Sequence, residues 1–361
     1  MKFVHIADMH FDSPFVNLSD KEGLGDLRRL EQRKALKKVI QYIKENNINY
    51  LFISGDLYEQ KYIKKSTIEY INNLFKEIPD TKIFISPGNH DPYVKNSYYN
   101  QFNWNKNVKI FNSNIEKVEL EDANIYGFGF DDFYCKNSGI ENIEINNKEK
   151  LNILVIHGSL DGGTLENSEY NPLSRKMLKE KGYDYVALGH IHKLDYNEEE
   201  NQNIVYPGST VSLGFDELGK HGMIEGDLEK EKINLKFIPL DSTEFKLEEI
   251  DVTEINSKEE LIEKINELEI DENNLIEIIL IGRRNFEIDK YELYRLISND
   301  KIIKIKNKTK INYDLNKLAN ENTLKGLFAN EMLKKLNNEN LSEEDKEIIE
   351  KAVEIGMEAL E

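Results

Sequence analysis

Short apolar runs alternate with amphipathic stretches along the first two-thirds of the chain. Strands are predicted at six of these runs, namely residues 2–6, 50–54, 82–86, 125–128, 151–156 and 183–188. A helix between the first two is predicted by apolar residues at spacings of three and four, at Leu36, Val39, Ile40 and Ile43. The next helix is predicted to begin at Ser66, with Glu69 completing a capping box. Strands that alternate with helices in this way are typical of an α/β fold.

A second alternation of strands and helices follows residue 240. The predicted elements are a strand at 245–250, a helix opened by Ser257 and Glu260, a strand at 275–281, a helix at 291–297 and a strand at 302–311. From residue 323 the pattern is helical, and the final helix is predicted to begin at Ser342, with Asp345 three residues later. We therefore expect a main domain, a small α/β domain and a helical segment, at residues 1–240, 241–313 and 314–361.

The composition is that of a folded protein without a membrane span. With 361 residues, of which 39% are hydrophobic and 32% charged, the chain is long enough for roughly two domains with real cores. No apolar run approaches the ~18 residues of a membrane span, and the N-terminus lacks a signal-peptide pattern. The single cysteine, Cys135, excludes a disulfide framework, and a cytoplasmic protein is expected. Taken alone, the formal net charge of −19 argues against a partner made of phosphates.

Polar residues that can bind a metal follow five of the predicted strands. They are Asp8 and His10, then Asp56, then Asn89 with His90 and Asp91, then His157, and finally His190 with His192. Five of the seven histidines lie in these clusters, although a single histidine is more often a surface or core residue. Because the carboxyl ends of neighbouring strands in an open α/β sheet converge at one edge, we expect the clusters to meet in one pocket.

The types of donor indicate which ions such a pocket would take. Imidazole, carboxylate and amide ligands together suit Mn, Fe or Zn, and the share of oxygen favours Mn²⁺. If one carboxylate serves two sites, the pocket holds two divalent ions roughly 3.5–4 Å apart.

In their order along the chain, the clusters resemble the motifs of calcineurin-like metallophosphoesterases. The matching residues are Asp8-Met9-His10, Gly55-Asp56, Gly88-Asn89-His90-Asp91, His157-Gly158 and Gly189-His190-Ile191-His192. The resemblance implies a four-layer αββα sandwich. It implies one metal held by Asp8, His10, Asp56 and His192, and a second held by Asp56, Asn89, His157 and His190. It also implies that His90 protonates the leaving oxygen, and Asp91 is expected to orient His90 and stabilise its imidazolium.

Finer features are similar to the YhaO-like branch of the SbcD-type DNA repair exonuclease family. They lie at residues 8–15, 183–192 and 205–209. The family pattern has a glycine soon after the first motif, where this chain has Asp12-Ser13-Pro14. The resemblance implies that residues 241–313 form a capping domain that contacts DNA, and that the C-terminal helices bind an SbcC-like coiled-coil ATPase of the SMC type. The alternatives are an accessory domain for docking or for a homodimer, and helices that only pack on their own domain.

Basic residues gather in the second part of the chain. Lysines recur from Lys301 to Lys310, and two arginines follow the preceding strand. We expect contacts with DNA phosphates from Arg283, Arg284, Lys304, Lys306 and Lys308. The alternative is a sheet edge that lysines protect against aggregation.

The predicted function is a metal-dependent phosphodiesterase that serves as a DNA exonuclease or endonuclease subunit in DNA repair. In this interpretation two metal ions activate water and His90 donates a proton. The alternatives are a metallophosphatase or cyclic-nucleotide phosphodiesterase of the same superfamily, and a non-catalytic scaffold subunit. The charge does not exclude DNA, because two divalent ions would outweigh the carboxylates of Asp8 and Asp56. Much of the acidic excess lies in residues 241–361, with 18 basic and 30 acidic side chains.

Overall fold

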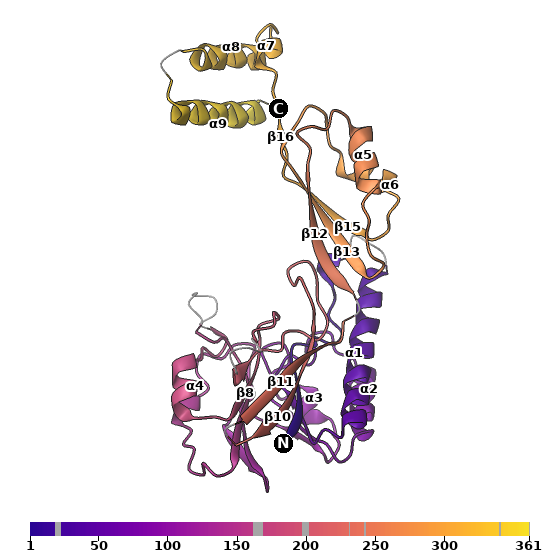
Figure 1. The fold of residues 1–361 in the computed structure, drawn as a ribbon, viewed down its shortest axis with the longest axis vertical. Helices are drawn as coiled ribbons and strands as arrows, with labels where there is room; N and C mark the ends of the chain where they lie inside the picture. The colour runs from indigo at the N-terminus through magenta and orange to yellow at the C-terminus, as the bar shows by residue number, and fades with distance from the viewer. Residues whose placement is uncertain are drawn as a thin grey trace. The chain divides into compact units, whose positions relative to one another are not determined.

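The computed structural model describes most of the chain in two compact units. The described residues are 1–18, 23–161, 169–196, 202–230, 232–241, 243–338 and 341–360. The units are Met1–Phe245 and Lys246–Glu361 (Figure 1). The division into three parts at residues 240 and 313 stays a prediction.

Two sheets form the centre of the first unit. The six-stranded sheet has the order β11-β10-β1-β2-β3-β4, with β1 Lys2–Ile6, β2 Tyr50–Ile53, β3 Lys82–Ile85, β4 Val108–Ile110, β10 Gly222–Glu229 and β11 Lys232–Pro239. The five-stranded sheet has the order β5-β6-β7-β8-β9, with β5 Glu116–Glu119, β6 Ala123–Gly127, β7 Leu151–His157, β8 Tyr185–Gly189 and β9 Ile204–Val205. Strands β1 to β4 pair in parallel, as do β6 to β9, so each set ends at one edge of its sheet.

Alternating side chains on the central strands build the layers. Phe3 and Phe52 of the first sheet pack against Ile153 and Val155 of the second, so the sheets bury their inner faces against each other. Neighbouring positions such as Leu51 face the opposite way, because successive side chains of a strand point to opposite faces.

Helices cover both outer faces of the paired sheets. Helices α1 (Leu24–Asn46) and α2 (Lys65–Lys76) pack on the first sheet, and α4 (Arg175–Lys181) packs on the second. Figure 1 shows α4 on one side of the strands and α1 and α2 on the other. The predicted four-layer αββα sandwich is confirmed. The shorter helical elements are η1 Val16–Leu18, α3 Tyr98–Gln101 and η2 Ile140–Asn142.

The second unit is a small α/β structure followed by helices, as predicted. Its three-stranded sheet has the order β12-β13-β15, with β12 Glu244–Asp251, β13 Asn274–Ile281 and β15 Ile302–Asn307. Its core is shared between this sheet and two helices, α5 Lys258–Asn266 and α6 Lys290–Leu296. A two-stranded pair and three helices complete the unit: β14 Arg283–Arg284, β16 Lys310–Ile311, α7 Leu315–Leu318, α8 Leu324–Leu336 and α9 Glu343–Ala359.

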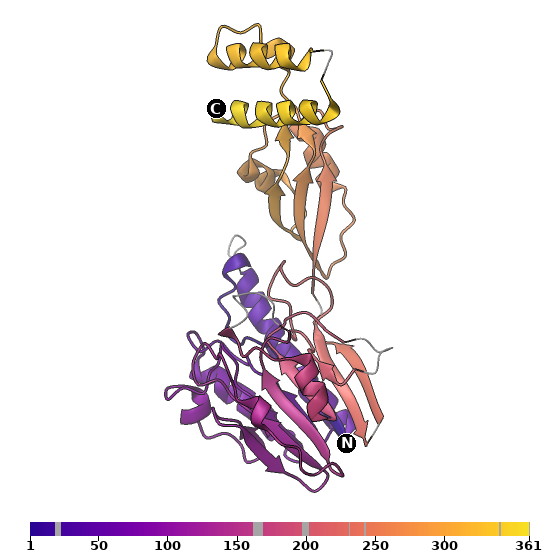
Figure 2. The same cartoon turned by 90° about the vertical axis from the view of Figure 1, so that its left-hand side faces the viewer.

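Helices α8 and α9 lie side by side in both views (Figure 1, Figure 2). Ala329 of α8 packs with Val353 and Met357 of α9 in a small apolar cluster. In the part of the chain that the structure describes, none of the helices combines the length and the apolar character that a membrane crossing requires.

Candidate metal centre

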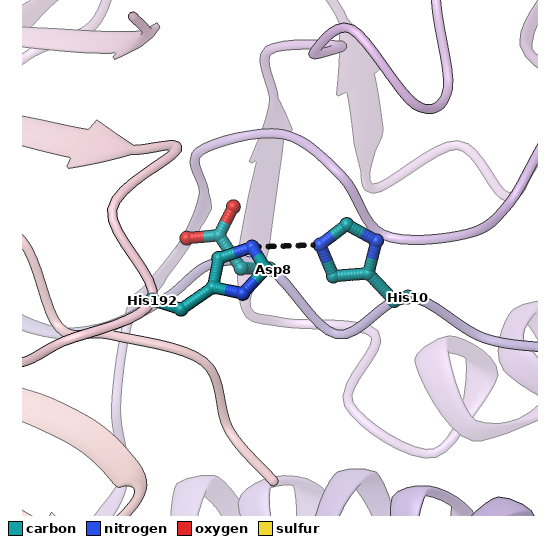
Figure 3. Close-up of side chains that lie close together, drawn as sticks. All are labelled: Asp8, His10 and His192. Carbon is teal, nitrogen blue, oxygen red and sulfur yellow. Dashed lines mark hydrogen bonds between the residues drawn. The ribbon is translucent and has the colours of Figure 1, made fainter. Parts of the chain in front are cut away.

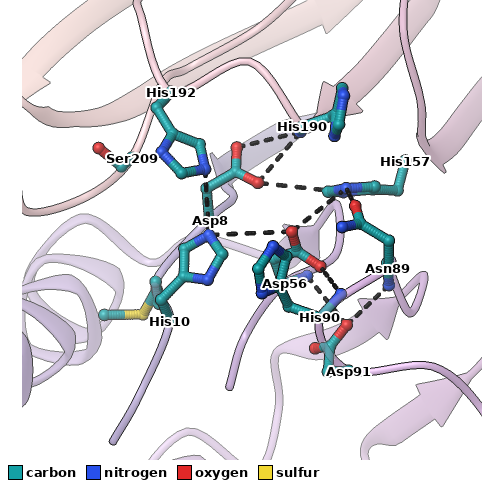
Figure 4. Close-up of polar contacts among 12 residues, drawn as sticks. Asp8, His10, Asp56, Asn89, His90, Asp91, His157, His190, His192 and Ser209 are labelled. Atoms are coloured by element: carbon teal, nitrogen blue, oxygen red, sulfur yellow. Dashed lines mark hydrogen bonds and ion pairs between the residues drawn. The ribbon is translucent and has the colours of Figure 1, made fainter. Parts of the chain in front are cut away.

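The last residue of β7 and the loops that follow β1, β2, β3 and β8 bring the predicted site residues together (Figure 4). The first two loops are tied by backbone hydrogen bonds, from Asp8 N–H to the Gly55 carbonyl at 3.1 Å and from His10 N–H to the Asp56 carbonyl at 2.9 Å. The residues Asp8, His10 and Asp56 have φ angles of 51°, 49° and 50°, in the left-handed region. Such conformations cost roughly 1–3 kcal/mol each and concentrate at functional sites.

One glycine is required by the close approach of these loops. A Cβ added at Gly88 would overlap the Asp56 carboxylate and come within 2.9 Å of the His157 ring. The loop after β3 can therefore reach the pocket only with glycine at this position.

Three sets of potential ligand atoms lie in the pocket, each set within 4.8 Å of one another: Asp8, His10 and His192; His10, Asp56 and His90; Asp8, Asp56 and His157. Figure 3 shows the first set, in which the Nε2 atoms of His10 and His192 lie 3.1 Å apart. Asp56 is shared, because its Oδ2 lies 3.8 Å from His10 Nε2 and 3.4 Å from His157 Nε2. Its side chain is buried, as expected for a carboxylate between two cation positions.

In three of the histidines, a hydrogen bond at Nδ1 leaves Nε2 available to a cation. His157 Nδ1 lies 2.9 Å from the Ser54 carbonyl, which can only accept, so this nitrogen carries the proton and Nε2 keeps its lone pair. His10 Nδ1 lies 2.8 Å from Glu59 Oε1, and His192 Nδ1 lies 2.5 Å from Glu217 Oε1. A partner of this kind is typical of metal-binding histidines, so the residues fit divalent metal ions.

Asn89 and His190 take different positions around these sets. Asn89 Oδ1 lies 3.0 Å from His157 Nε2, close to the shared carboxylate, and its role as a ligand of the second metal stays a prediction. Among the histidines predicted as ligands, His190 is the one outside the three sets. Its ring packs edge-on to the His157 ring with centroids 5.2 Å apart, and its backbone N–H donates to Asp8 Oδ1 at 3.0 Å. The ligand role of His190 stays a prediction.

Two glutamates that the sequence analysis missed hold the histidines in place. Glu59 contacts two rings, with Oε1 on His10 and Oε2 3.0 Å from His90 Nδ1. Glu217 contacts His192 and accepts hydrogen bonds from Ser209 Oγ at 2.8 Å and from Leu213 N–H at 3.0 Å. Glu59 lies three residues after Asp56 and follows the same strand, which is a weak signal. Glu217 lies far from every motif, and no pattern indicates it.

The buried charges shift one another's pKa values. Burial raises the pKa of Asp8 to about 8. Burial acts against ionisation of Asp56 and Glu59 as well, but the neighbouring histidines lower the pKa of Asp56 and bring that of Glu59 to about 2. Burial also opposes protonation of His90, but the hydrogen bond that its ring donates to Glu59 and the charge of Asp56 raise its pKa to about 9. The pocket therefore combines the ionised carboxylates of Asp56 and Glu59 with the protonated imidazole of His90.

The structure corrects the role expected of Asp91. Its buried carboxylate accepts the backbone N–H groups of Asp56, Leu57 and Gly88, at 3.0, 2.6 and 2.7 Å, and the Tyr99 hydroxyl at 2.6 Å. These bonds join the loops after β2 and β3, and Glu59 is the carboxylate on the His90 ring. The prediction that Asp91 orients His90 is therefore wrong, because four donors turn its carboxylate towards the loops. The charge of Asp91 does help to raise the pKa of His90, as expected for stabilisation of the imidazolium.

The predicted DNA contacts lie in the second unit and are mostly engaged there. Lys304 and Lys306 lie 3.6 and 3.0 Å from the buried carboxylate of Glu277. Arg283 lies 3.7 and 3.5 Å from Glu350 and Glu354 of α9. Arg284 Nε donates to Thr309 Oγ1 at 2.9 Å, and Lys308 is exposed. Contact with DNA stays a prediction for all five residues.

The sequence is also similar to a known protein family and to several known proteins. Residues 1–194 match the family model described as calcineurin-like phosphoesterase. The chain is 25% identical over 276 residues to the metallophosphoesterase YhaO of Bacillus subtilis (strain 168), covering 74% of this chain and 67% of YhaO. It is 30% identical over 304 residues to the SbcD subunit of the SbcCD nuclease of Staphylococcus epidermidis, covering 73% of this chain and 75% of that subunit. It is 28% identical over 298 residues to the corresponding SbcCD nuclease subunit of Staphylococcus saprophyticus, covering 73% and 74%.

Proposed function

The chain belongs to the calcineurin-like phosphoesterase family, and from this premise we propose that it is a metal-dependent phosphodiesterase that cleaves DNA as a nuclease subunit in DNA repair. The observation that carries the proposal is the shared Asp56 carboxylate, with His10 on one side, His157 on the other and His90 alongside. The similarity to the SbcD subunits of SbcCD nucleases supports DNA as the substrate.

We assign the two metal positions to the residues that surround Asp56. Asp8, His10, Asp56 and His192 would hold the first ion, and Asp56, Asn89, His157 and His190 the second. Mn²⁺ is the proposed ion because carboxylate and amide oxygens accompany the imidazoles. Bound in such a site, divalent ions lower the pKa of water and offset the charge of the phosphate.

His90 is the proposed proton donor to the leaving oxygen. Its side chain is 45% exposed, whereas His10 and His157 are buried. Glu59 holds Nδ1 at 3.0 Å, which leaves Nε2 to face a substrate. The hydrogen bond to Glu59 and the charge of Asp56 raise the pKa of His90, which favours the protonated ring that donates a proton as the phosphorus–oxygen bond breaks.

A coiled-coil ATPase of the SMC type is the proposed partner. The support is four exposed apolar side chains on the C-terminal helices, Leu324 and Leu327 of α8 and Ile348 and Ile355 of α9, each more than 60% exposed. Apolar side chains that protrude in this way are typical of surfaces that bind a helix.

One assay separates this proposal from a phosphatase. The full chain with Mn²⁺ is given end-labelled linear DNA, single- and double-stranded, together with a phosphodiester and a phosphomonoester of p-nitrophenol. We expect cleavage of DNA and of the diester, and loss of both activities on addition of EDTA. Hydrolysis of the monoester without cleavage of DNA, with or without the ATPase, would contradict the proposal.

A further inference from the structure

A cavity of about 510 Å³ lies beside the proposed proton donor. His90 and Asn89 form part of its wall, and aromatic side chains form much of the rest. The volume is in the range of small-molecule sites, which is about 300–1,000 Å³. The metal centre itself needs no such space, because its ligands lie within a few ångströms of one another. The cavity therefore suits a part of the substrate that is attached to the phosphate.

The aromatic side chains around the cavity are not all buried in the core. Tyr62 and Tyr134 are 52% and 55% exposed, although most tyrosines that lie near the sheets are buried. The Tyr134 ring is inclined by 32° to the Tyr170 ring with centroids 5.8 Å apart, and the Tyr170 ring is inclined by 34° to the His190 ring at 5.1 Å. A row of rings thus runs from the metal centre to the exposed Tyr134, within the distances at which aromatic groups attract one another.

We propose that this cavity is a nucleobase subsite, in which the base on the leaving side of the scissile phosphate packs against the Tyr134 and Tyr62 rings. The proposal rests on the proposed function, because the leaving side follows from the role of His90 as proton donor. A phosphate next to Asn89 and the metal ligands places its leaving oxygen at His90, and the attached nucleoside then enters the cavity.

The chemistry of the wall favours a base over other occupants. Every nucleobase has an aromatic face, and stacking on a protein ring contributes about 1–3 kcal/mol per base. A phosphorylated serine or threonine has no ring to place there. The carboxylate of Glu59 is held by two histidines, so little free negative charge faces the cavity. Lys61, which is exposed, adds a positive charge to the wall for an adjoining phosphate.

The direct test compares two short single-stranded substrates that contain one cleavable phosphodiester. The leaving nucleoside is thymidine in one substrate and an abasic deoxyribose analogue in the other. With Mn²⁺ bound, we expect kcat/KM to be about 10-fold or more higher for the thymidine substrate, since tenfold corresponds to ~1.4 kcal/mol of stacking. Tyr134→Ala should remove most of this preference, because it should lower kcat/KM far more for the thymidine substrate than for the abasic one, and Tyr134→Phe should keep the preference.

Tyr291→Ala is the matched control, because this tyrosine is 88% exposed in the other unit and should not alter the preference. Equal kcat/KM values for both substrates in the wild-type protein would overturn the subsite. An equal loss on both substrates in Tyr134→Ala would overturn it too, because it would indicate a structural role for the ring.

A binding measurement keeps the subsite testable if DNA is not cleaved. Calorimetry on the Mn²⁺-loaded chain compares thymidine 5′-monophosphate with deoxyribose 5-phosphate and with phosphotyrosine. We expect the nucleotide to bind most tightly, and its advantage over the sugar phosphate to fall in Tyr134→Ala. Base-dependent binding without DNA cleavage would support the subsite and contradict the nuclease. Cleavage without base preference would contradict the subsite alone, and tighter binding of phosphotyrosine would overturn the assignment to a base.

Discussion

The carboxylate of Glu59 connects the metal centre to the proposed proton donor, since one oxygen contacts His10 and the other contacts His90. Glu217 contacts the ligand His192 and has no bond to His90 among the described residues. The two glutamates therefore form a natural pair for separating metal binding from proton transfer. Partners that orient ligand histidines typically contribute 10- to 100-fold to metal affinity or activity.

We expect Glu59→Gln to weaken Mn²⁺ binding and to lower kcat by about 10- to 100-fold even when metal is saturating. Glu217→Gln should weaken Mn²⁺ binding to a similar degree, with kcat at saturating metal close to that of the wild type. Titration calorimetry gives the affinity, and kcat as a function of Mn²⁺ concentration gives the rate. Identical kcat losses in the two variants would contradict the separate role of Glu59.

His90→Asn tests the proton donor itself. The variant keeps a polar side chain but cannot carry the proton, so kcat should fall by about 100-fold or more, the usual contribution of general acid catalysis. Bound Mn²⁺ should stay close to the wild-type amount. Loss of metal in this variant would instead indicate that His90 is a ligand, because a ring nitrogen of His90 lies within 4.8 Å of ligand atoms of His10 and Asp56.

His5 provides a pH-dependent prediction away from the metal ligands. Its ring is buried and lies 2.9 Å from both the Tyr185 hydroxyl and Ser54 Oγ, and burial lowers its pKa to about 3. An unfolded chain binds a proton at this histidine below pH ~6.5, whereas the folded chain does not until pH falls to about 3. Its contribution to the free energy of unfolding is therefore complete above pH ~6.5 and is lost as pH decreases, by up to ~1.4 kcal/mol per pH unit.

Urea unfolding followed by fluorescence of Trp104, the single tryptophan, measures this contribution in the first unit. Between pH 7.5 and 4.5, wild-type stability should fall relative to that of His5→Gln, which has no titrating group at this position. Parallel curves of unfolding free energy against pH for the two proteins would show that His5 does not contribute to the pH dependence of stability.

At the scale of single residues, the motifs predicted which side chains lie together, and metal binding by them stays a prediction. The positions of Asp8, His10, Asp56 and His157 followed from strand ends that converge. Asp91 was assigned the wrong contact because the spacing of a motif does not show where a side chain points. Glu217 could not be predicted, since its loop meets His192 only in the folded chain.

At the scale of elements, the starts of three helices show which sequence signals were sufficient to predict where a helix begins. Ser257 and Ser342 cap α5 and α9 as predicted, accepting hydrogen bonds from Glu260 N–H at 3.2 Å and Asp345 N–H at 3.1 Å. The capping box predicted at Ser66 is wrong, because α2 begins at Lys65 and has Lys64 as its N-cap residue. The Lys64 N–H donates instead to Asp12 Oδ2 at 3.0 Å, a contact from a distant loop.

Because Ser257 caps α5 and Ser66 does not cap α2, two matched substitutions should have different effects. Ser257→Ala should destabilise α5 by about 1 kcal/mol, because it removes the oxygen that accepts from Glu260 N–H. Ser66→Ala should change α2 by less than about 0.5 kcal/mol, because no cap depends on it. Hydrogen exchange of peptides from the two helices measures the local stability of each helix. Equal protection losses in both helices would contradict the assignment.

Several strands were not predicted from the sequence, for two different reasons. Strands β4 and β9 have three and two residues, too few for a periodicity to appear. Strand β11 does alternate between exposed and partly buried positions, and its polar–apolar alternation would have been sufficient to predict it. The core strands β1, β2 and β3 were predictable because they are almost wholly buried.

At the scale of the whole molecule, the net charge of −19 predicts weak binding of DNA by the isolated chain. Three of the five basic side chains expected to touch DNA lie against acidic groups, Lys304 and Lys306 against Glu277 and Arg283 against Glu354, and this reduces their uncompensated charge. We expect an affinity for duplex DNA that falls steeply with salt and rises when Mn²⁺ is bound. Fluorescence anisotropy with and without Mn²⁺, at several salt concentrations, measures this, and tight salt-independent binding would contradict it.

The central claim is that Asp56 joins two metal ions in one phosphodiesterase site, and metal content measured together with activity tests it most directly. Wild-type chain loaded with Mn²⁺ and freed of excess ion should retain two ions per chain, as expected for a two-metal site, and hydrolyse a phosphodiester. Asp56→Asn should retain fewer ions and lose hydrolysis by about 100-fold or more. Two retained ions and an undiminished rate in Asp56→Asn would contradict the account.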